Sequence, residues 1–289
     1  MNTNILSSID LKQAVGRLDS LPAMPIIARK LLALKLDTDQ DEQQMLLLIA
    51  QDPLISARII GLANSPLFGS SRKISTVKDA SLLLGLKRVK SVATGLALLA
   101  QVNKPVGRLN IPALWEHNMG VAFAMLAIVS AMPAKMRAND DLTFLAGMLH
   151  DVGYSVLAHL DVEWSDELQT RMVTEPNRLA VELELEVVGL THDELGAELA
   201  RHWDLPEEIV AAIRYHHDVD KSDSAQPLAR IINLAEKLLP SSGFPERIDT
   251  IVAAEDWLAL GIDPERSEDI VALVAEQAEQ ASQFASSFG

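Results

Sequence analysis

The sequence contains no cysteine among its 289 residues. This absence excludes disulfide bonds, thiolate nucleophiles and cysteine-ligated zinc sites, and it suits a reducing compartment. The amino terminus also lacks the basic segment and apolar run of a signal peptide. We find no uncharged apolar run of about 18 residues, the length that a transmembrane helix needs. We therefore expect a cytoplasmic protein that makes no membrane contact.

Alternating β-branched residues bounded by turn signals are missing as well, whereas apolar residues recur at helical spacing along almost the whole chain. Hydrophobic residues make up 48% of the sequence, which is enough for a substantial core. The sequence therefore predicts an all-α protein.

Positive charge is scarce, and its distribution is uneven. The net charge is −15, yet residues 1–100 hold 12 Lys and Arg against 8 Asp and Glu, while residues 101–289 hold 13 against 32. Such an acidic chain repels nucleic acid overall. A basic cluster has no aromatic residues among it, so we interpret it as a solvated helix face. It comprises Arg72, Lys73, Lys78, Lys87, Arg88 and Lys90.

Local signals predict where several helices begin and end. Asp52-Pro53 starts one helix. Thr76 with Asp79 forms a capping box at the start of a second helix, and Thr191 with Glu194 forms a capping box at the start of a third. A helix is expected to begin at Asp41-Glu42. Further helices are expected from about Ile26, from Asn139-Asp140-Asp141 with His150-Asp151 near its end, from Asp204-Leu205-Pro206 to His216-His217, and around Ile231 to Leu239. The other expected helices cover about 3–18, 86–102, 112–131, one or two within 161–190, and then 245–259 and 265–284.

Composition and charge both change near Asn103–Gly107, which we interpret as a hinge. The sequence thus predicts two helical lobes that pack against each other. The first is an amino-terminal helical bundle over residues 1–107 and the second covers 108–242, with carboxy-terminal helices over 243–289.

Histidines and carboxylates gather at helix ends and on apolar helix faces of the second lobe. His150-Asp151 ends an apolar helical run, and Gly147 one turn earlier leaves room for another element to approach. Taken alone, each histidine has an ordinary structural interpretation, such as a hydrogen-bonded core residue or a surface residue of a capping turn. His159 and His202 are interpreted only in this way.

Together these side chains form an array of imidazole and carboxylate ligands that suits one or two ions of Fe, Mn, Zn or Mg. Two adjacent ions would activate a bridging water and clamp a phosphoryl group. The predicted metal ligands are His117, His150, Asp151, His192, His216, His217 and Glu236.

At these residues the sequence resembles the HD superfamily of metal-dependent phosphohydrolases, in which a helical domain holds a His, His-Asp, Asp ligand set. His117 matches the first histidine and His150-Asp151 match the doublet. Glu236 stands in place of the family aspartate and reaches one methylene further.

The chain is more similar to the HDOD family, regulatory relatives of these enzymes in bacterial signalling. This resemblance covers roughly residues 18–240 and implies an amino-terminal helical lobe joined to an HD-like lobe, a signalling role and, often, no hydrolase activity. It is carried by Leu21-Pro22-Ala23-Met24-Pro25, Asp52-Pro53-Leu54, Ala63-Asn64-Ser65, Leu84-Gly85, Phe144 to Gly153, His192 to Trp203, Leu205-Pro206 and His216-His217.

The related HD-GYP cyclic-dinucleotide phosphodiesterases carry a lysine after the His-Asp-x-Gly element and a long signature loop. Here Tyr154 takes the lysine position, and Asp218 follows His216-His217 without that signature. We therefore expect a catalytically degenerate signalling protein that keeps a metal pocket and acts through protein partners. An active phosphohydrolase or phosphodiesterase is the alternative, with a nucleotide or cyclic dinucleotide as its ligand, and a helical adaptor without metal is a third.

Overall fold

The structure is a computed structural model, and it describes residues 21–69, 72–104, 107–138, 140–221, 227–239, 244–246 and 248–286. Within these ranges the regular secondary structure is helical and contains no strand, which confirms the predicted all-α class. The helix expected over residues 3–18 lies outside the described ranges.

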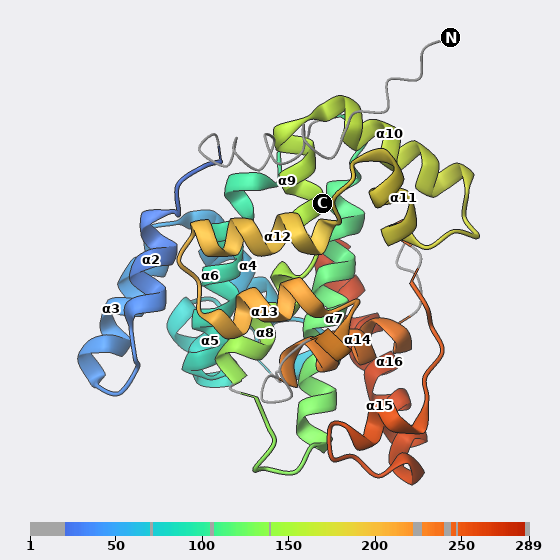
Figure 1. Cartoon of the computed structure of the whole chain (residues 1–289). Helices are drawn as coiled ribbons and strands as arrows, with labels where there is room; N and C mark the ends of the chain where they lie inside the picture. Colours follow the sequence, from blue (N-terminus) through green and yellow to red (C-terminus); the bar gives the residue numbers. More distant parts are fainter. Residues whose placement is uncertain are drawn as a thin grey trace.

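The helices form two lobes, followed by a carboxy-terminal group (Figure 1). The first lobe contains α2 (Ile26–Ala33), α3 (Asp39–Ala50), α4 (Pro53–Ala63), the 3-10 turn η2 (Pro66–Phe68), α5 (Val77–Leu84) and α6 (Leu86–Val102). The second contains α7 (Ile111–Ala131), α8 (Asp140–Leu149), α9 (Val152–Leu160), α10 (Val162–Thr174), α11 (Ala180–Val187), α12 (His192–His202), α13 (Glu207–Tyr215), η3 (Val219–Lys221) and α14 (Pro227–Leu238). The carboxy-terminal group is α15 (Ala254–Leu258), η4 (Pro264–Arg266) and α16 (Ser267–Ser286).

Side-chain caps fix the helix starts that the sequence predicted. The Asp52 carboxylate accepts hydrogen bonds from the backbone N–H groups of Leu54 and Ile55 at 2.9 and 3.1 Å, and the Thr76 hydroxyl accepts one from Asp79 at 3.0 Å. Such bonds satisfy amides that have no partner within the helix. The expected start at Asp41 is two residues late, because Thr38 caps a helix that begins at Asp39.

One continuous hydrophobic core joins the lobes. Helix α6 packs against α2 in the first lobe and against α8 in the second, while α16 lies along α7. Figure 1 shows α2 and α3 on one side of the molecule and α15 and α16 on the other. Helix α7 is the central element of the second lobe, because α8, α14 and α16 all contact it.

Among the described residues, α7 is the one single helix long and apolar enough to meet the length and composition criteria of a membrane span, although it contains Glu116. Of its apolar window, 78% is buried inside the protein. The helix is apolar on all sides because other helices surround it, as expected for a core helix.

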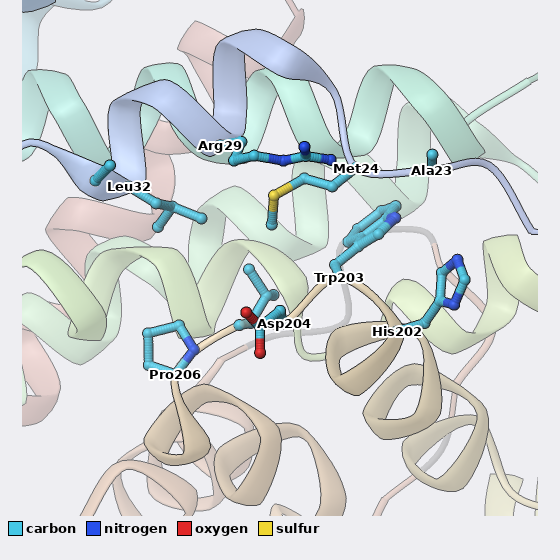
Figure 2. A pocket seen from close by; sticks show the side chains of 10 residues that line it. Ala23, Met24, Arg29, Leu32, His202, Trp203, Asp204 and Pro206 are labelled. Carbon is cyan, nitrogen blue, oxygen red and sulfur yellow. The ribbon is translucent and has the colours of Figure 1, made fainter.

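A cavity of about 860 Å³ lies where α2 faces the turn between α12 and α13 (Figure 2). The Trp203 indole N–H donates to the carbonyl of Pro22 at 2.9 Å, which fastens this turn to the first lobe. None of the predicted metal ligands lines the cavity, whereas His202 does. The lining residues are Ala23, Met24, Arg29, Leu32, Ala33, His202, Trp203, Asp204, Leu205 and Pro206.

Candidate metal centre

The structure brings all seven predicted ligands together in one cluster of the second lobe. Six helices position them, and most of the ligands stand at helix ends. His117 lies on α7, His150 and Asp151 between α8 and α9, His192 at the start of α12, His216 and His217 directly after α13, and Glu236 on α14.

Two glycines allow these helices to approach closely. A Cβ atom on Gly147 would lie 2.5 Å from the Cα of Ala122, so only glycine lets α8 pack this closely on α7, as the sequence suggested. A Cβ atom on Gly153 would lie 1.8 Å from the backbone oxygen of His192. The absence of these two side chains therefore brings His150 and His192 within reach of the other ligands.

Polar contacts set the remaining backbone positions. The Arg214 guanidinium on α13 pairs with Asp193 and Glu194 on α12 at 3.2 and 2.7 Å. The Asn233 amide on α14 donates to the backbone oxygen of His216 at 2.8 Å. The end of α13 is thus held between α12 and α14, with its two histidines facing the cluster.

The ligands fall into two groups that share Asp151. In the first group, Oδ2 of Asp151 lies 3.4 Å from Nε2 of both His117 and His150. Glu236 completes this group, since its Oε1 lies 3.5 Å from Nε2 of His150 and 4.0 Å from that of His117.

The second group contacts the other oxygen of the same aspartate. Oδ1 of Asp151 lies 3.3 Å from Nε2 of His192 and 3.8 Å from Nε2 of His216. Nε2 of His217 lies 3.1 Å from Nε2 of His192. Asp151 therefore stands between a three-histidine group and a two-histidine group, where its two oxygens could be shared by two metal ions.

The tautomers of the imidazoles fit metal ligation. Nδ1 of His150 lies 2.8 Å from the carbonyl of Gly147, and Nδ1 of His216 lies 2.7 Å from the carbonyl of Ile213. A carbonyl only accepts, so each Nδ1 carries a proton and Nε2 is the ring atom left for a metal. Nε2 of His216 faces Nε2 of His192 at 3.2 Å, so a metal ion that displaces any proton held there could bind both rings.

The carboxylates provide a second test of fit. Both oxygens of Asp151 and both of Glu236 are buried and make no hydrogen bond within the described residues. Asp151 precedes α9 as its N-cap residue, yet its side chain caps no backbone amide. Buried carboxylates without donors are costly unless a cation compensates them. The chain therefore fits one or two divalent ions at this place.

The electrostatics separate the imidazoles into two kinds. Burial, reinforced by the neighbouring rings of His217 and His192, holds the pKa of His216 well below its ordinary value, and burial also lowers the pKa of His117. Burial opposes the charged form of His150 too, but Asp151 and Glu236 outweigh it and raise the pKa of His150 to about 9.

Sequence reasoning missed Glu246. Its Oε1 lies 3.3 Å from Nε2 of His217 and 3.8 Å from Nε2 of His192, so it joins the second group. The helix expected over 245–259 begins later and is shorter, because only Ala254–Leu258 is helical and the described residues between Phe244 and Ala253 are not.

Glu184 and the role of Tyr154 were also missed. The Glu184 carboxylate lies 2.7 Å from Nδ1 of His192 and accepts the backbone N–H of His192 at 3.0 Å. The Tyr154 hydroxyl lies 2.7 Å from Glu184 and 3.0 Å from Glu246, and its ring stacks on His192 at 4.4 Å between centroids. Such outer partners orient metal-ligating histidines. In the sequence, Glu184 was one of many acids in a helical segment.

The surroundings of the cluster are acidic. Among the described contacts, no lysine or arginine pairs with the carboxylates of Asp151, Glu184, Glu236 or Glu246. A cavity of about 240 Å³ adjoins His217, and its one lysine, Lys237, pairs with Asp256 at 3.2 Å. The lining residues of that cavity are Leu179, Ala180, Val181, His217, Asp218, Val219, Asp220, Asn233, Lys237, Ile248 and Asp249.

The profile of the HDOD domain family matches residues 21–219. Among solved structures, an HDOD domain protein of unknown function from Geobacter sulfurreducens is 27% identical, with a TM-score of 0.76 and coverage of 96% of both chains. A candidate signal transduction protein from Marinobacter aquaeolei VT8 has a TM-score of 0.81 at 23% identity, covering 97% of this chain and 65% of its own.

A candidate phosphohydrolase from Shewanella amazonensis SB2B has a TM-score of 0.72 at 20% identity, covering 94% of this chain and 97% of its own. An uncharacterised protein of Treponema pallidum is 25% identical over 227 residues, which are 76% of this chain and 42% of that protein. The chain thus spans less than half the length of this relative, and the Marinobacter and Shewanella structures support the fold alone.

Proposed function

Because the chain belongs to the HDOD family, we propose that it is a regulatory protein of bacterial-type signal transduction that binds divalent metal but does not hydrolyse phosphate esters. The observation that carries this proposal is the pairing of Tyr154 with Glu184 and Glu246 at the edge of the ligand cluster. At this position the chain presents a neutral hydroxyl bonded to carboxylates, where a phosphodiesterase needs a cation for its substrate.

The metal-binding part of the proposal rests on the chemistry of the donor set. His117, His150 and Glu236 would hold one ion, and His192, His216 and His217 a second, with Asp151 shared between them. Imidazole together with carboxylate suits Fe, Mn or Zn, and Mg is the hardest of the candidate ions. Bound ions of this kind supply Lewis acidity and a water of lowered pKa.

The absence of hydrolysis follows from what the chain presents to an anion. Burial, together with the charges of Glu184 and Glu246, raises the pKa of Tyr154 well above its ordinary value, so the hydroxyl stays protonated and bonded. The neighbouring cavity carries Asp218, Asp220 and Asp249, whose charges repel a phosphate.

A second candidate function is an active metal-dependent phosphohydrolase. The contacts of both Asp151 oxygens favour it, since a carboxylate between two groups of imidazoles is the usual means of holding two ions for in-line phosphoryl displacement. A nucleotide or cyclic dinucleotide would then be the ligand.

The proposed partners are other proteins of a signalling pathway in the cytoplasm. Two features support protein partners over nucleic acid: the net charge of −15 and the acidic second lobe. The related Marinobacter structure is itself described as a candidate signal transduction protein, at an identity that supports only the fold.

The experiment measures metal content and hydrolysis on the same samples. The protein is purified without oxygen, stripped of metal, and reconstituted in turn with Mn²⁺, Fe²⁺, Zn²⁺ and Mg²⁺. Wild-type protein, His150→Ala and the control His202→Ala are compared, because His202 lines a separate cavity.

We expect stoichiometric metal in wild-type and His202→Ala, reduced metal in His150→Ala, and no turnover of a cyclic dinucleotide or of bis-p-nitrophenyl phosphate. Steady hydrolysis that His150→Ala abolishes would overturn the proposal in favour of the phosphohydrolase. If wild-type protein binds none of the ions, the remaining interpretation is a helical adaptor without metal.

A further inference from the structure

We infer that Glu246 is a metal ligand that the carboxy-terminal segment, residues 244–253, contributes to the His192–His216–His217 group, so that bound metal fastens this segment onto the second lobe. The inference rests on the proposed metal pocket. It goes further in assigning a ligand that follows α14, outside the helices that carry the seven predicted ligands.

The carboxylate of Glu246 is placed as a ligand. Its Oε1 lies 3.3 Å from Nε2 of His217, and its side chain is only 4% exposed. Its Oε2 is buried and makes no hydrogen bond within the described residues. Asp151, His192 and Glu246 present ligand atoms that all lie within 4.8 Å of one another. An ion at this point would contact carboxylates from both sides.

Phe244 anchors the same segment two residues earlier. Its side chain is 3% exposed, and its ring packs on Tyr154 and His117 with centroids 5.1 and 6.3 Å apart. Apolar packing of this kind holds the segment close to the cluster. Electrostatic interactions then determine whether the Glu246 carboxylate contacts the histidines of the cluster.

Charge determines whether that approach is favourable. Without a metal ion, the carboxylate of Glu246 is buried within 4.8 Å of that of Asp151, whose like charge repels it, while the imidazoles of His217 and His192 attract it. A divalent ion attracts both carboxylates and removes the repulsion. Metal binding and docking of the segment therefore favour each other, and by linkage each changes the other by the same factor.

The regions on both sides keep the segment near the site. On one side, α14 carries the ligand Glu236, and Lys237 on the same helix pairs with Asp256 on α15 at 3.2 Å. On the other, α16 lies along α7, where Ser282 donates a hydrogen bond to Glu116. The segment can therefore detach from the cluster without the carboxy-terminal helices leaving the protein.

The test uses the full chain, stripped of metal, with Mn²⁺ as the probe. Glu246→Gln keeps the shape of the side chain but removes its charge, and Asp249→Asn is a matched control because it makes the same change on an exposed residue of the same segment. Calorimetry gives the affinity and stoichiometry of Mn²⁺. Trypsin cleavage after Arg247, followed by mass spectrometry, reports on docking of the segment.

We expect Glu246→Gln to weaken the binding of one Mn²⁺ at least about tenfold, since loss of even an outer partner of a metal ligand typically costs 10–100-fold. Mn²⁺ should slow cleavage after Arg247 by a similar factor in wild-type protein and in Asp249→Asn, but not in Glu246→Gln. Circular dichroism and unfolding confirm that each variant is folded.

The possible failures are distinguishable. If wild-type protein binds no Mn²⁺, the proposed metal pocket is wrong and the inference falls with it. If wild-type protein binds Mn²⁺ and Glu246→Gln binds it equally well, with the same protection from trypsin, the inference alone is overturned.

Discussion

Replacing Gly153 by alanine tests how the close crossing of α9 and α12 builds the cluster. The added Cβ would lie 1.8 Å from the oxygen, 2.5 Å from the carbon and 2.8 Å from the Cα of His192. All three are backbone atoms, so no change of rotamer relieves the overlap. An ordinary contact begins at 3.4 Å, so the two helices must separate by about 1.6 Å at this point.

This separation sets the magnitude of the effect. Overpacking a core costs about 1–3 kcal/mol, and a clash with backbone belongs at the upper end of that range. This cost is partly offset, because alanine in a helix interior is up to about 1 kcal/mol more favourable than glycine. The free energy of unfolding should therefore fall by about 2 kcal/mol. Metal ligation tolerates only about 0.2 Å of misplacement, so His192 should also be lost as a ligand.

The assay is urea unfolding of the metal-free proteins, together with the Mn²⁺ stoichiometry of the folded ones. Gly120→Ala on α7 is the matched control, because among the described residues its Cβ meets only a Leu239 methyl carbon within 4 Å, at 3.8 Å. It should leave metal binding unchanged and add up to about 1 kcal/mol of stability. Gly153→Ala that unfolds like wild-type protein and keeps its full metal content would refute this reasoning.

Two other perturbations test the polar network. Tyr154→Phe should lower the free energy of unfolding by about 1.5–3 kcal/mol in urea titrations, because it removes a buried hydrogen bond to the charged Glu184 and leaves only His192 as its partner; an unchanged value would show that the bond contributes nothing. Adding Mn²⁺ to metal-free protein at pH 7.5 should release protons, because the pKa of His150 is about 9 without metal. The calorimetric heat should then depend on the buffer, and the affinity should fall as the pH falls; a heat independent of the buffer would contradict this. The same raised pKa stabilises the metal-free fold below about pH 6.5, and this contribution is lost as the pH rises through 9.

Local physics explains why much of the fold was predictable. The caps at Asp52 and Thr76 are contacts between residues two or three positions apart, so the sequence displays them directly. The ligands His150 and Asp151 were recognisable because two ionisable residues end an apolar helix. The helix expected over 112–131 is α7, which begins one residue earlier at Ile111, and it has the composition of a membrane span because other helices surround it.

Glu246 and Glu184 could not be found in the same way. Glu246 lies 29 residues after His217 in the chain and contacts it only through the fold. The residues around Glu246 form no polar and apolar pattern that would mark it as a ligand. Glu184 lies among alternating acids, and only its distance of 2.7 Å from His192 distinguishes it from its neighbours. Both roles depend on how segments that are far apart in the sequence pack together. The spacing of residues along the chain does not reveal that packing.

The most direct test of the metal centre is a crystal structure of the Mn²⁺-loaded protein with anomalous diffraction at the manganese edge. We predict two peaks that share Asp151, one beside His117, His150 and Glu236, and the other beside the three remaining histidine ligands, His192, His216 and His217. Loaded crystals with no peak in this cluster, or with a peak that does not contact Asp151, would contradict it.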